Sequence, residues 1–388
     1  MSKNVAIIGI GQTKFGELWD YSLRDLMAEA GTNALKDAGV EKNEIDYLSV
    51  GNMSAGRFVG QEHVGALAAD VLGIKAPAIR CEAACASGSV AFRSALHAVQ
   101  SGNCETAMVL GVEKMTDVHG AGALTSLAAA GDQEWEASIG LTFAGLYALM
   151  ARRHMHEYGT TQEQLAMVSV VNHENGKNNP YAQFRNSISV EDVLKSSMVA
   201  DPLRLLDCSP ITDGAAAVII TSEKNAKKTQ NPVWVLGSAQ SSDTLALHDR
   251  KSFTELLATK QAVKDVFVKT GLTQKSIDLI EVHDCFSINQ IMAMEDLGFC
   301  KKGMGGKFVE SGGIKLNGEI PTNTLGGLKA SGHPVGATGV RQLCDLTKQL
   351  RGTAPNQVKN AKKALNLNIG GSGATAVINI LGVEPNAS

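Results

Sequence analysis

The chain has 388 residues, of which 44% are hydrophobic and 19% are charged, values that are ordinary for a soluble globular protein. Its formal net charge of −3 argues against the strongly basic surface that binding to nucleic acid requires. A single hydrophobic core stops growing at about 250–300 residues, so this length predicts two domains or one domain built from two similar halves.

The amino-terminal stretch MSKNVAIIGIG contains an apolar run that is too short for a signal peptide. The chain also has no stretch of 18 apolar residues, so we expect a cytoplasmic protein with reduced thiols. GIGQTKFG, which follows the strand-like VAII, suggests a dinucleotide-binding loop, but Lys14 stands where that fingerprint needs its third glycine. A Rossmann-type dehydrogenase is therefore not expected.

Two segments of the chain, 33–52 and 265–284, align without a gap. Each segment is typical of a helix, a glycine stop, a short turn and then a strand. DGAAAVIIT at 213–221 likewise matches GSGATAVIN at 371–379. We therefore predict an internal duplication. The aligned pairs include Gly39 with Gly271, Ile45 with Ile277, Asp46 with Asp278 and Val50 with Val282.

CEAACASGSVAF, at 81–92, places Cys85 just before a helix-like run. The dipole and free N–H groups of a helix start favour a thiolate and lower the pKa of a cysteine from about 8.5. The small neighbours Ala86, Ser87 and Gly88 leave room for a substrate at the sulfur. Cys85 is therefore either a nucleophile or a buried cysteine at a tight strand-to-helix junction. The seven cysteines form no CxxC pair, so no metal site is expected.

The two halves differ in length, because 176 positions separate Gly39 from Ala215 whereas 103 separate Gly271 from Ala374. The surplus of 73 residues in the first half lies between about 115 and 200. This stretch is first rich in Ala and Met and then polar, and we predict a mostly helical insertion. Elsewhere strands and helices alternate, which favours a parallel sheet covered by helices in each half.

EVHDCFS, at 281–287, continues a segment that is typical of a strand. Successive side chains on a strand point to opposite faces, so His283 and Cys285 are expected to share one face and Asp284 to take the other. Two titratable side chains on one face at the end of a strand suit a catalytic site. Considered alone, each of them is better explained as a core residue.

Two glycine-rich stretches near the carboxyl end add further candidates. LGGLKASGHPVGATGVRQL, at 325–343, places His333 before Pro334, a residue suited to the first position of a helix. The helix dipole opposes a positive charge there, so His333 is expected to stay neutral and to act as a general base, a hydrogen-bond donor or a plain cap. LNLNIGGSGAT, at 365–375, offers Gly370, whose N–H would face an oxyanion unless this is a simple turn between strands.

Four motifs in order within a duplicated frame resemble the thiolase family. They are CAS at 85–87, HDCF at 283–286, GHP at 332–334 and NIGGSG at 368–373. GQTKFGELW, NHENGKNNPYAQF and LLDCSPITDGAAAVI are most similar to the sterol-carrier-protein-type branch, in particular to archaeal acetoacetyl-CoA thiolases. The resemblance covers nearly the whole chain.

The resemblance implies an α/β fold in which two βαβαβαββ halves form a five-layered αβαβα core. Residues 1–115 and 201–228 would form the amino-terminal half, and 229–388 the carboxyl-terminal half. Residues 116–200 would form a mostly helical loop insertion that covers the active site.

The resemblance also implies a role for each candidate residue. Cys85 resembles the nucleophile that becomes acylated, and His333 resembles the base that activates it and helps to hold an oxyanion. The N–H groups of Cys85 and Gly370 would hold the acyl oxygen. His283 would form an oxyanion hole for the thioester oxygen of the second substrate.

One departure from the family pattern moves the acid/base function. Asn368 stands where most thiolases have a second catalytic cysteine, and an amide does not exchange a proton near neutral pH. Cys285 is then expected to be the acid/base. A cysteine of ordinary pKa is a weak base for a thioester carbon acid, so donors aimed at the enolate oxygen must contribute several kcal/mol.

The resemblance implies an acetyl-CoA C-acetyltransferase that condenses two acetyl-CoA into acetoacetyl-CoA and CoA, reversibly and by ping-pong acyl transfer. Coenzyme A thioesters would be its substrates, with no permanently bound cofactor. The alternatives are a thiolase for another 3-oxoacyl-CoA, a decarboxylating ketoacyl synthase and a non-catalytic lipid-transfer protein. GHP and Cys285 argue against the synthase. The chain ends at Ser388 soon after its last strand, which argues against lipid transfer.

The partners expected from the resemblance are further copies of the chain, in a homodimer or homotetramer. Members of this branch also assemble with a zinc-ribbon/OB-fold protein and with hydroxymethylglutaryl-CoA synthase. No nucleic acid and no membrane partner is expected.

Overall fold

The computed structural model describes residues 4–386, which form eleven strands and fourteen α-helices. The strands are β1 (Val5–Gln12), β2 (Tyr47–Gly51), β3 (Ala78–Cys81), β4 (Thr106–Glu113), β5 (Met198–Ala200), β6 (Leu203–Arg204), β7 (Gly214–Ser222), β8 (Val233–Ser242), β9 (Leu279–Glu281), β10 (Lys363–Gly370) and β11 (Thr375–Gly382). The helices are α1 (Leu23–Ala38), α2 (Ala55–Phe58), α3 (Val64–Leu72), α4 (Ser87–Ser101), α5 (Gly120–Ala128), α6 (Phe143–Tyr158), α7 (Gln162–Gly176), α8 (Val190–Lys195), α9 (Glu223–Ala226), α10 (Leu257–Thr270), α11 (Ser287–Asp296), α12 (Gly305–Glu310), α13 (Gly327–Ser331) and α14 (Thr338–Arg351). No helix in this range has both the length and the apolar character that crossing a membrane requires.

Nine of these strands form one sheet in the order β3-β2-β4-β7-β1-β8-β11-β10-β9. The outer strands pair in parallel, but β4, β7 and β1 pair antiparallel, as do β8, β11 and β10. The sheet is therefore mixed and not parallel throughout, because a short turn such as the one between β10 and β11 joins only antiparallel strands. In the second half, the counterpart of β3 is reduced to a single bridge between Ile280 and Thr322.

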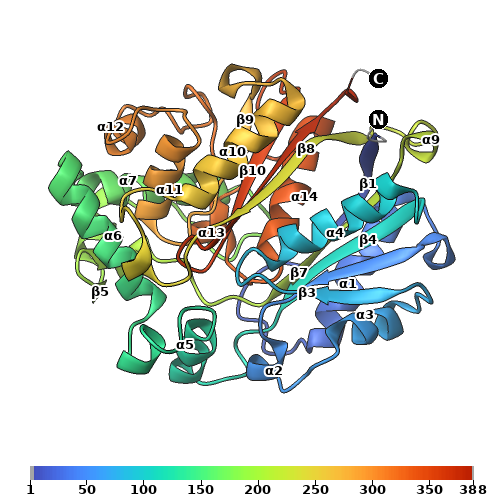
Figure 1. Ribbon diagram of the computed structural model, residues 1–388, viewed down its shortest axis with the longest axis horizontal. Coiled ribbons are helices and arrows are strands. Elements are labelled where there is room, and N and C mark those ends of the chain that lie inside the picture. The colour runs from blue at the N-terminus through green and yellow to red at the C-terminus, as the bar shows by residue number, and fades with distance from the viewer. Residues whose placement is uncertain (1–3, 387–388) are drawn as a thin grey trace.

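Helices α4 and α14 form a middle layer between strands of the two halves (Figure 1). One hydrophobic core joins Phe92 and Leu96 of α4 to Leu343 and Leu346 of α14 and to strands of both halves. On the outer side, α1 and α3 cover the strands of the first half and α10 covers those of the second. The α/β fold with layered helices and sheets is confirmed.

The predicted duplication is visible in the backbone and in its supporting side chains. Gly39 and Gly271 each end a helix in the left-handed conformation, with φ of 64° and 68°. Asp46 accepts hydrogen bonds from two backbone N–H groups at the start of β4, at 2.9 and 3.1 Å. Asp278 accepts two at the start of β10, both at 2.8 Å. Each carboxylate thereby fixes the start of the neighbouring strand.

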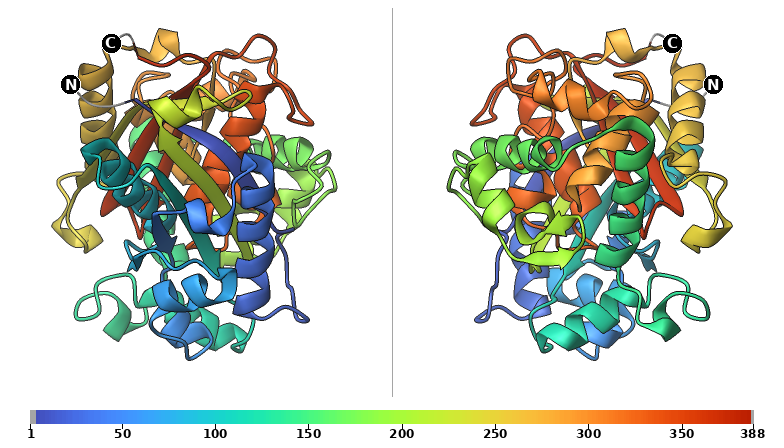
Figure 2. Two further views of the ribbon diagram at one scale, coloured as in Figure 1. Left: turned by 90° about the vertical axis from the view of Figure 1, so that its right-hand side faces the viewer. Right: turned by 90° about the vertical axis from the view of Figure 1, so that its left-hand side faces the viewer.

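Between β4 and β7 the chain leaves the sheet and forms α5 to α8 and the small β5–β6 ladder. Although this insertion interrupts the first half, α6 and α7 pack against α11 and α12 of the second half, on the side seen in the right-hand view of Figure 2. Buried His154 of α6 anchors it, with Nε2 at 3.1 Å from the Glu295 carboxylate of α11. The insertion is mostly helical, as expected, and the domain boundaries at 115, 200 and 228 stay predictions.

Candidate active site

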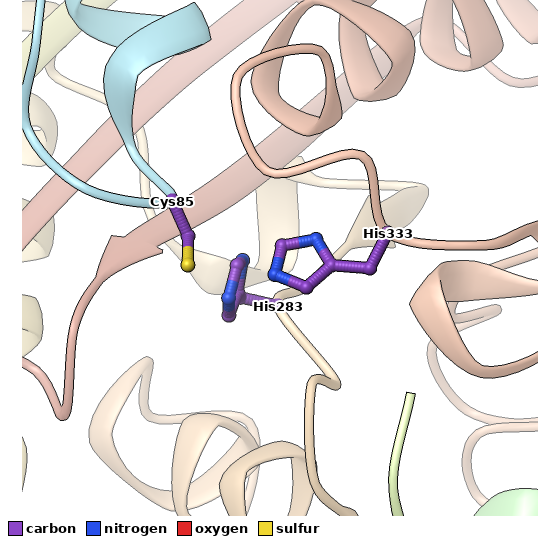
Figure 3. Close-up of side chains that lie close together, drawn as sticks. All are labelled: Cys85, His283 and His333. Carbon is purple, nitrogen blue, oxygen red and sulfur yellow. The ribbon is translucent and has the colours of Figure 1, made fainter. Parts of the chain in front are cut away.

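Three side chains meet between the two halves: Cys85 from the first, and His283 and His333 from the second (Figure 3). The Cys85 sulfur and one ring nitrogen of each histidine lie within 4.8 Å of one another. The two imidazole rings meet edge to face, with centroids 5.0 Å apart and planes at 83°. Thiolates and imidazoles also ligate zinc, so the expectation that no metal binds stays a prediction.

A tight turn between β3 and α4 holds Cys85. Ala84 adopts the left-handed region with φ of 51°. The Ser87 hydroxyl accepts a backbone N–H at 3.0 Å and donates to the carbonyl of Ala84 at 2.6 Å. A Cβ atom at Gly88 would lie 2.7 Å from the carbonyl oxygen of Gly336. The small residues after Cys85 therefore allow the two halves to pack closely at the sulfur.

Burial raises the pKa of the Cys85 thiol to about 12. The N–H groups of Gly371 and of Cys85 itself oppose this rise by hydrogen bonding to the sulfur, whereas the charge of Glu113 adds to it. The expected lowering by the helix dipole is therefore wrong, because desolvation at this position outweighs the field of the helix. The resting thiol is protonated at neutral pH and needs a base.

His333 lies in the turn between α13 and α14, and the helix begins at Thr338 and not at Pro334 as expected. Its Nδ1 is 2.6 Å from the Thr338 hydroxyl oxygen, and that hydroxyl donates its own proton to the Pro334 carbonyl at 3.1 Å. With the hydroxyl proton directed to that carbonyl, the hydroxyl oxygen accepts from Nδ1–H, and the lone pair is then on Nε2. Nε2 is the nitrogen that points toward Cys85 and His283 in Figure 3.

Burial lowers the pKa of His333 to about 3, and the positive charge of Arg341 adds to that effect. His333 is therefore neutral at physiological pH, as expected, although burial is the cause and not a helix dipole. A neutral imidazole with a free Nε2 lone pair is suited to accept the proton of the Cys85 thiol.

His283 and Cys285 lie beyond the end of β9, in the loop before α11, so strand alternation does not place them. The Asn368 amide nitrogen donates to the Cys85 carbonyl at 3.0 Å and lies 3.2 Å from Nδ1 of His283. An amide N–H₂ can only donate, so Nδ1 accepts and the proton is on Nε2. Nε2 has no hydrogen-bond partner within residues 4–386. His283 is thus a free donor, the opposite tautomer to His333.

Burial lowers the pKa of His283 well below its usual value, and the positive charge of Arg341 acts in the same direction, as a protonated His333 would. The imidazole is therefore neutral. Its Nε2–H is available to a developing oxyanion without the cost of a buried charge.

Cys285 is buried, with 6% of its surface exposed. Burial raises the pKa of its thiol, and Cys85 lies near enough to raise it further. The hydroxyl of Tyr147 and the charge of Lys329 act in the opposite direction. Cys285 follows His283 by two residues in the same loop, and its place beside Cys85 in one site stays a prediction.

A cavity of about 410 Å³ opens at the turn that precedes Cys85. Its walls include Ala84, Gly370 and Gly371, together with Arg57 of α2. The backbone N–H of Gly371, one residue beyond the predicted donor, is among the groups that lower the pKa of Cys85. The oxyanion role of Gly370 stays a prediction, and so do the roles of the other site residues.

Three residues of this site were not found from the sequence. Thr338 follows His333 by five positions in a glycine-rich turn, and this proximity in the sequence was only a weak indication that it is the hydrogen-bond partner of His333. Asn368 was noted as a departure from the family pattern, but not as the group that orients His283. Tyr147 lies on an ordinary helix of the insertion and gave no signal.

Comparison with known proteins gave two family models, described as the thiolase amino-terminal domain over residues 5–224 and thiolase carboxyl-terminal domain-like over residues 239–383. The acetyl-CoA acetyltransferase of Methanothermobacter thermautotrophicus is 56% identical over 97% of this chain and 99% of its own length. Human sterol carrier protein 2 is 34% identical over 97% of this chain and 71% of its own length. The solved Ltp2-ChsH2(DUF35) aldolase is 27% identical, with a TM-score of 0.86 over 98% of each chain.

Proposed function

The chain belongs to the thiolase family, and we propose that it is an acetyl-CoA C-acetyltransferase that condenses two acetyl-CoA into acetoacetyl-CoA and CoA. The observation that carries this proposal is the meeting of Cys85 with two neutral histidines of opposite tautomer. One histidine can take a proton and the other can donate a hydrogen bond. The name of the 56% identical relative supports acetyl-CoA as the substrate.

In the first half-reaction, Nε2 of His333 takes the proton of the Cys85 thiol, and the sulfur attacks the carbonyl carbon of acetyl-CoA. The tetrahedral intermediate collapses, its C–S bond to CoA breaks, and the acetyl group stays on Cys85. The departing CoA thiolate takes the proton of Cys285 and leaves as the thiol. His333 is then an imidazolium and Cys285 a thiolate.

In the second half-reaction, the Cys285 thiolate removes a proton from the methyl group of a second acetyl-CoA. The enolate oxygen accepts a hydrogen bond from Nε2–H of His283. The enolate carbon attacks the acetyl group on Cys85, acetoacetyl-CoA leaves, and the imidazolium of His333 returns its proton to Cys85. All groups are then back in their starting protonation states.

A steady-state assay in both directions tests this proposal. We expect acetoacetyl-CoA to form from acetyl-CoA alone, and acetoacetyl-CoA with CoA to be cleaved to two acetyl-CoA. A panel of longer and aromatic 3-oxoacyl-CoA substrates serves as the comparison. Turnover of those substrates with none of acetoacetyl-CoA would contradict the acetyl preference, and dependence on a malonyl thioester would point to a decarboxylating synthase.

For partners, we propose a homo-oligomer in the cytoplasm. β3 is an outer strand of the nine-stranded sheet and exposes Ile79 to 40%, which supports pairing of this edge with a second copy. We also propose a complex with a zinc-ribbon/OB-fold protein, and the solved Ltp2-ChsH2(DUF35) aldolase, whose name couples two components, supports a complex with a second protein. Size-exclusion chromatography of the chain alone and co-expressed with such a protein is the test, and a monomeric wild-type chain would contradict the homo-oligomer.

A further inference from the structure

Tyr147 of α6 is fully buried against the residues that surround the two sulfurs. Its ring stacks on Phe286, the neighbour of Cys285, with centroids 4.7 Å apart and planes at 28°. Its hydroxyl donates to the carbonyl oxygen of Gly371 at 3.1 Å, and it lowers the pKa of the Cys285 thiol as a neighbouring donor. The insertion thus places one hydroxyl between the glycine turn and the second sulfur.

This hydroxyl has one proton and two possible acceptors. While Cys285 is a thiol, its S–H can donate to the Tyr147 oxygen, and the Tyr147 proton goes to the carbonyl of Gly371. Once Cys285 has lost its proton, the sulfur becomes the stronger acceptor, because hydrogen bonds to an ionised group are about twice as strong as neutral ones. A rotation about the C–O bond of the phenol is enough to exchange the acceptors.

We propose that Tyr147 is a positioning residue that holds Cys285 as a thiolate during catalysis, by turning its hydroxyl proton from the Gly371 carbonyl to the Cys285 sulfur. This inference rests on the proposed function, since it assumes that Cys285 is the acid/base. It assigns to the insertion a part in the chemistry and not only in covering the site. Cys285 is a thiolate from the moment its thiol gives a proton to the departing CoA until it removes a proton from the second acetyl-CoA.

The other polar groups near Cys285 are already engaged. The Asn289 amide nitrogen is 3.9 Å from the sulfur, too far for a strong bond, and it donates to the carbonyl of His283. The Lys329 ammonium donates to the carbonyl of Asp207 and acts on the sulfur through its charge. Within the described residues, Tyr147 is therefore the donor best placed to offset the burial that raises the pKa of Cys285.

The helix that carries Tyr147 is fixed on both sides of it. The Thr142 hydroxyl caps its start by accepting from the N–H of Gly145 at 3.2 Å. Two turns beyond Tyr147, His154 bonds to Thr160 at 2.8 Å and to Glu295 at 3.1 Å. A phenylalanine at position 147 would keep the ring packing and this anchorage, and would remove the hydroxyl alone.

Tyr147→Phe therefore separates the two half-reactions. We expect acetylation of Cys85, followed by mass spectrometry in a single turnover, to stay within about fivefold of wild type, because Cys285 keeps its proton until the CoA thiolate departs and the bond lost before that point is the neutral one to Gly371. Condensation should fall about tenfold to hundredfold, because the lost bond is to a charged sulfur. The loss should be in kcat and not in KM, and the pH profile of condensation should move to higher pH.

Tyr47→Phe is the matched control, because it also loses one hydroxyl hydrogen bond, to Ser94 at 3.1 Å, outside the site. We expect it to leave both half-reactions unchanged. Combined with Cys285→Ala, Tyr147→Phe should cause no further loss, as expected for two groups that act as a unit. If the variant slowed acetylation as much as condensation, or condensed like wild type, the inference would be overturned.

Should Tyr147→Phe fail to fold, 3-fluorotyrosine placed at position 147 gives a second readout with an opposite sign. The ring keeps its shape, but its hydroxyl is more acidic and a better donor, so the condensation profile should move to lower pH while acetylation is unchanged. An unmoved profile would overturn the inference. A wild-type protein that makes no acetoacetyl-CoA would instead overturn the proposed function and this inference with it.

Discussion

The first half of the molecule ends its strand β2 with Gly51, whereas the second half has His283 at the equivalent position after β9. The first half has no room for a side chain there, because a Cβ atom at Gly51 would lie 2.6 Å from the Cα atom of Gly88 in α4. In the second half, the same position opens toward Cys85. The two halves thus share the arrangement of their strands. They differ in the side chain at this position, because the close approach of α4 leaves room only for glycine in the first half.

The starts of the two middle-layer helices differ in a similar way. Cys85 precedes α4 and His333 precedes α14, so equivalent turns supply a sulfur from one half and a base from the other. Asp46 and Asp278, by contrast, have the same function in both halves. The comparison teaches that the supporting positions kept their roles after duplication while the positions at the meeting point diverged.

The largest expected effect comes from removing Cys85, which is the side chain that the first half contributes to the site. Cys85→Ala should reduce acetoacetyl-CoA formation by on the order of 10⁴-fold or more, because it removes the sulfur that attacks acetyl-CoA and carries the acetyl group. Mass spectrometry after mixing with acetyl-CoA should show no acetylated protein. If the variant kept its turnover and carried the acetyl group on another residue, the assignment of the acetyl-carrying group to Cys85 of the first half would be wrong.

The next effect separates the two sulfurs. Cys285→Ala should still acquire an acetyl group on Cys85 but condense about 10²- to 10⁴-fold more slowly, as expected when a general acid/base is lost. Rapid-quench measurement of each half-reaction is the check, and Cys300→Ala, which alters a half-buried cysteine outside the site, is the control. Normal condensation by the variant would show that a group other than Cys285 removes the proton from the second acetyl-CoA.

A smaller effect tests the tautomer of His333. Thr338→Val removes the acceptor for Nδ1–H, so acetylation should slow about tenfold to hundredfold as the base loses its fixed orientation. Thr347→Val is a matched control, because this threonine is buried on the same helix and its hydroxyl has no partner within residues 4–386. Equal rates for the two variants would mean that the Nδ1 contact does not set the tautomer.

The smallest effect tests the part of the frame that is symmetric. Asp46→Leu and Asp278→Leu should each lower the free energy of unfolding by about 1–2 kcal/mol, since each removes two backbone hydrogen bonds at a strand start. Urea unfolding of both variants is the measurement. A large loss for one and none for the other would show that the two halves are not equally stabilised by this contact.

The local features of the fold were accessible from the sequence. Gly39 and Gly271 marked the duplication because a left-handed helix end favours glycine, and Asp46 aligned with Asp278 because each fixes the same strand start. Cys85 and His333 were found because small residues must surround a reactive group at a close helix–helix approach. Each of these features depends on residues that are close together in the sequence, so it can be predicted without knowing which distant segments come into contact.

The features that depend on distant contacts were not accessible. The raised pKa of Cys85 follows from desolvation in the folded chain, and helix position alone suggested the opposite. His283 and Cys285 were placed by strand alternation, but the strand ends at Glu281 and the loop beyond it decides where they point. Tyr147 reaches the site because α6 packs across the second half, and no local pattern in α6 records that contact.

The strands of the two halves are joined side by side at two residue pairs, Ala6 with Trp234 and Ile7 with Val233. Cys85 stands on one side of this seam and both histidines on the other, so a small rotation between the halves would part the sulfur from the two imidazoles. The rate of acyl transfer should therefore depend on how the two halves are aligned. A single cut in the exposed turn between α9 and β8 would leave the two pieces held together by the core that α4 and α14 share, so acyl transfer should survive the cut and be lost only when the pieces are separated.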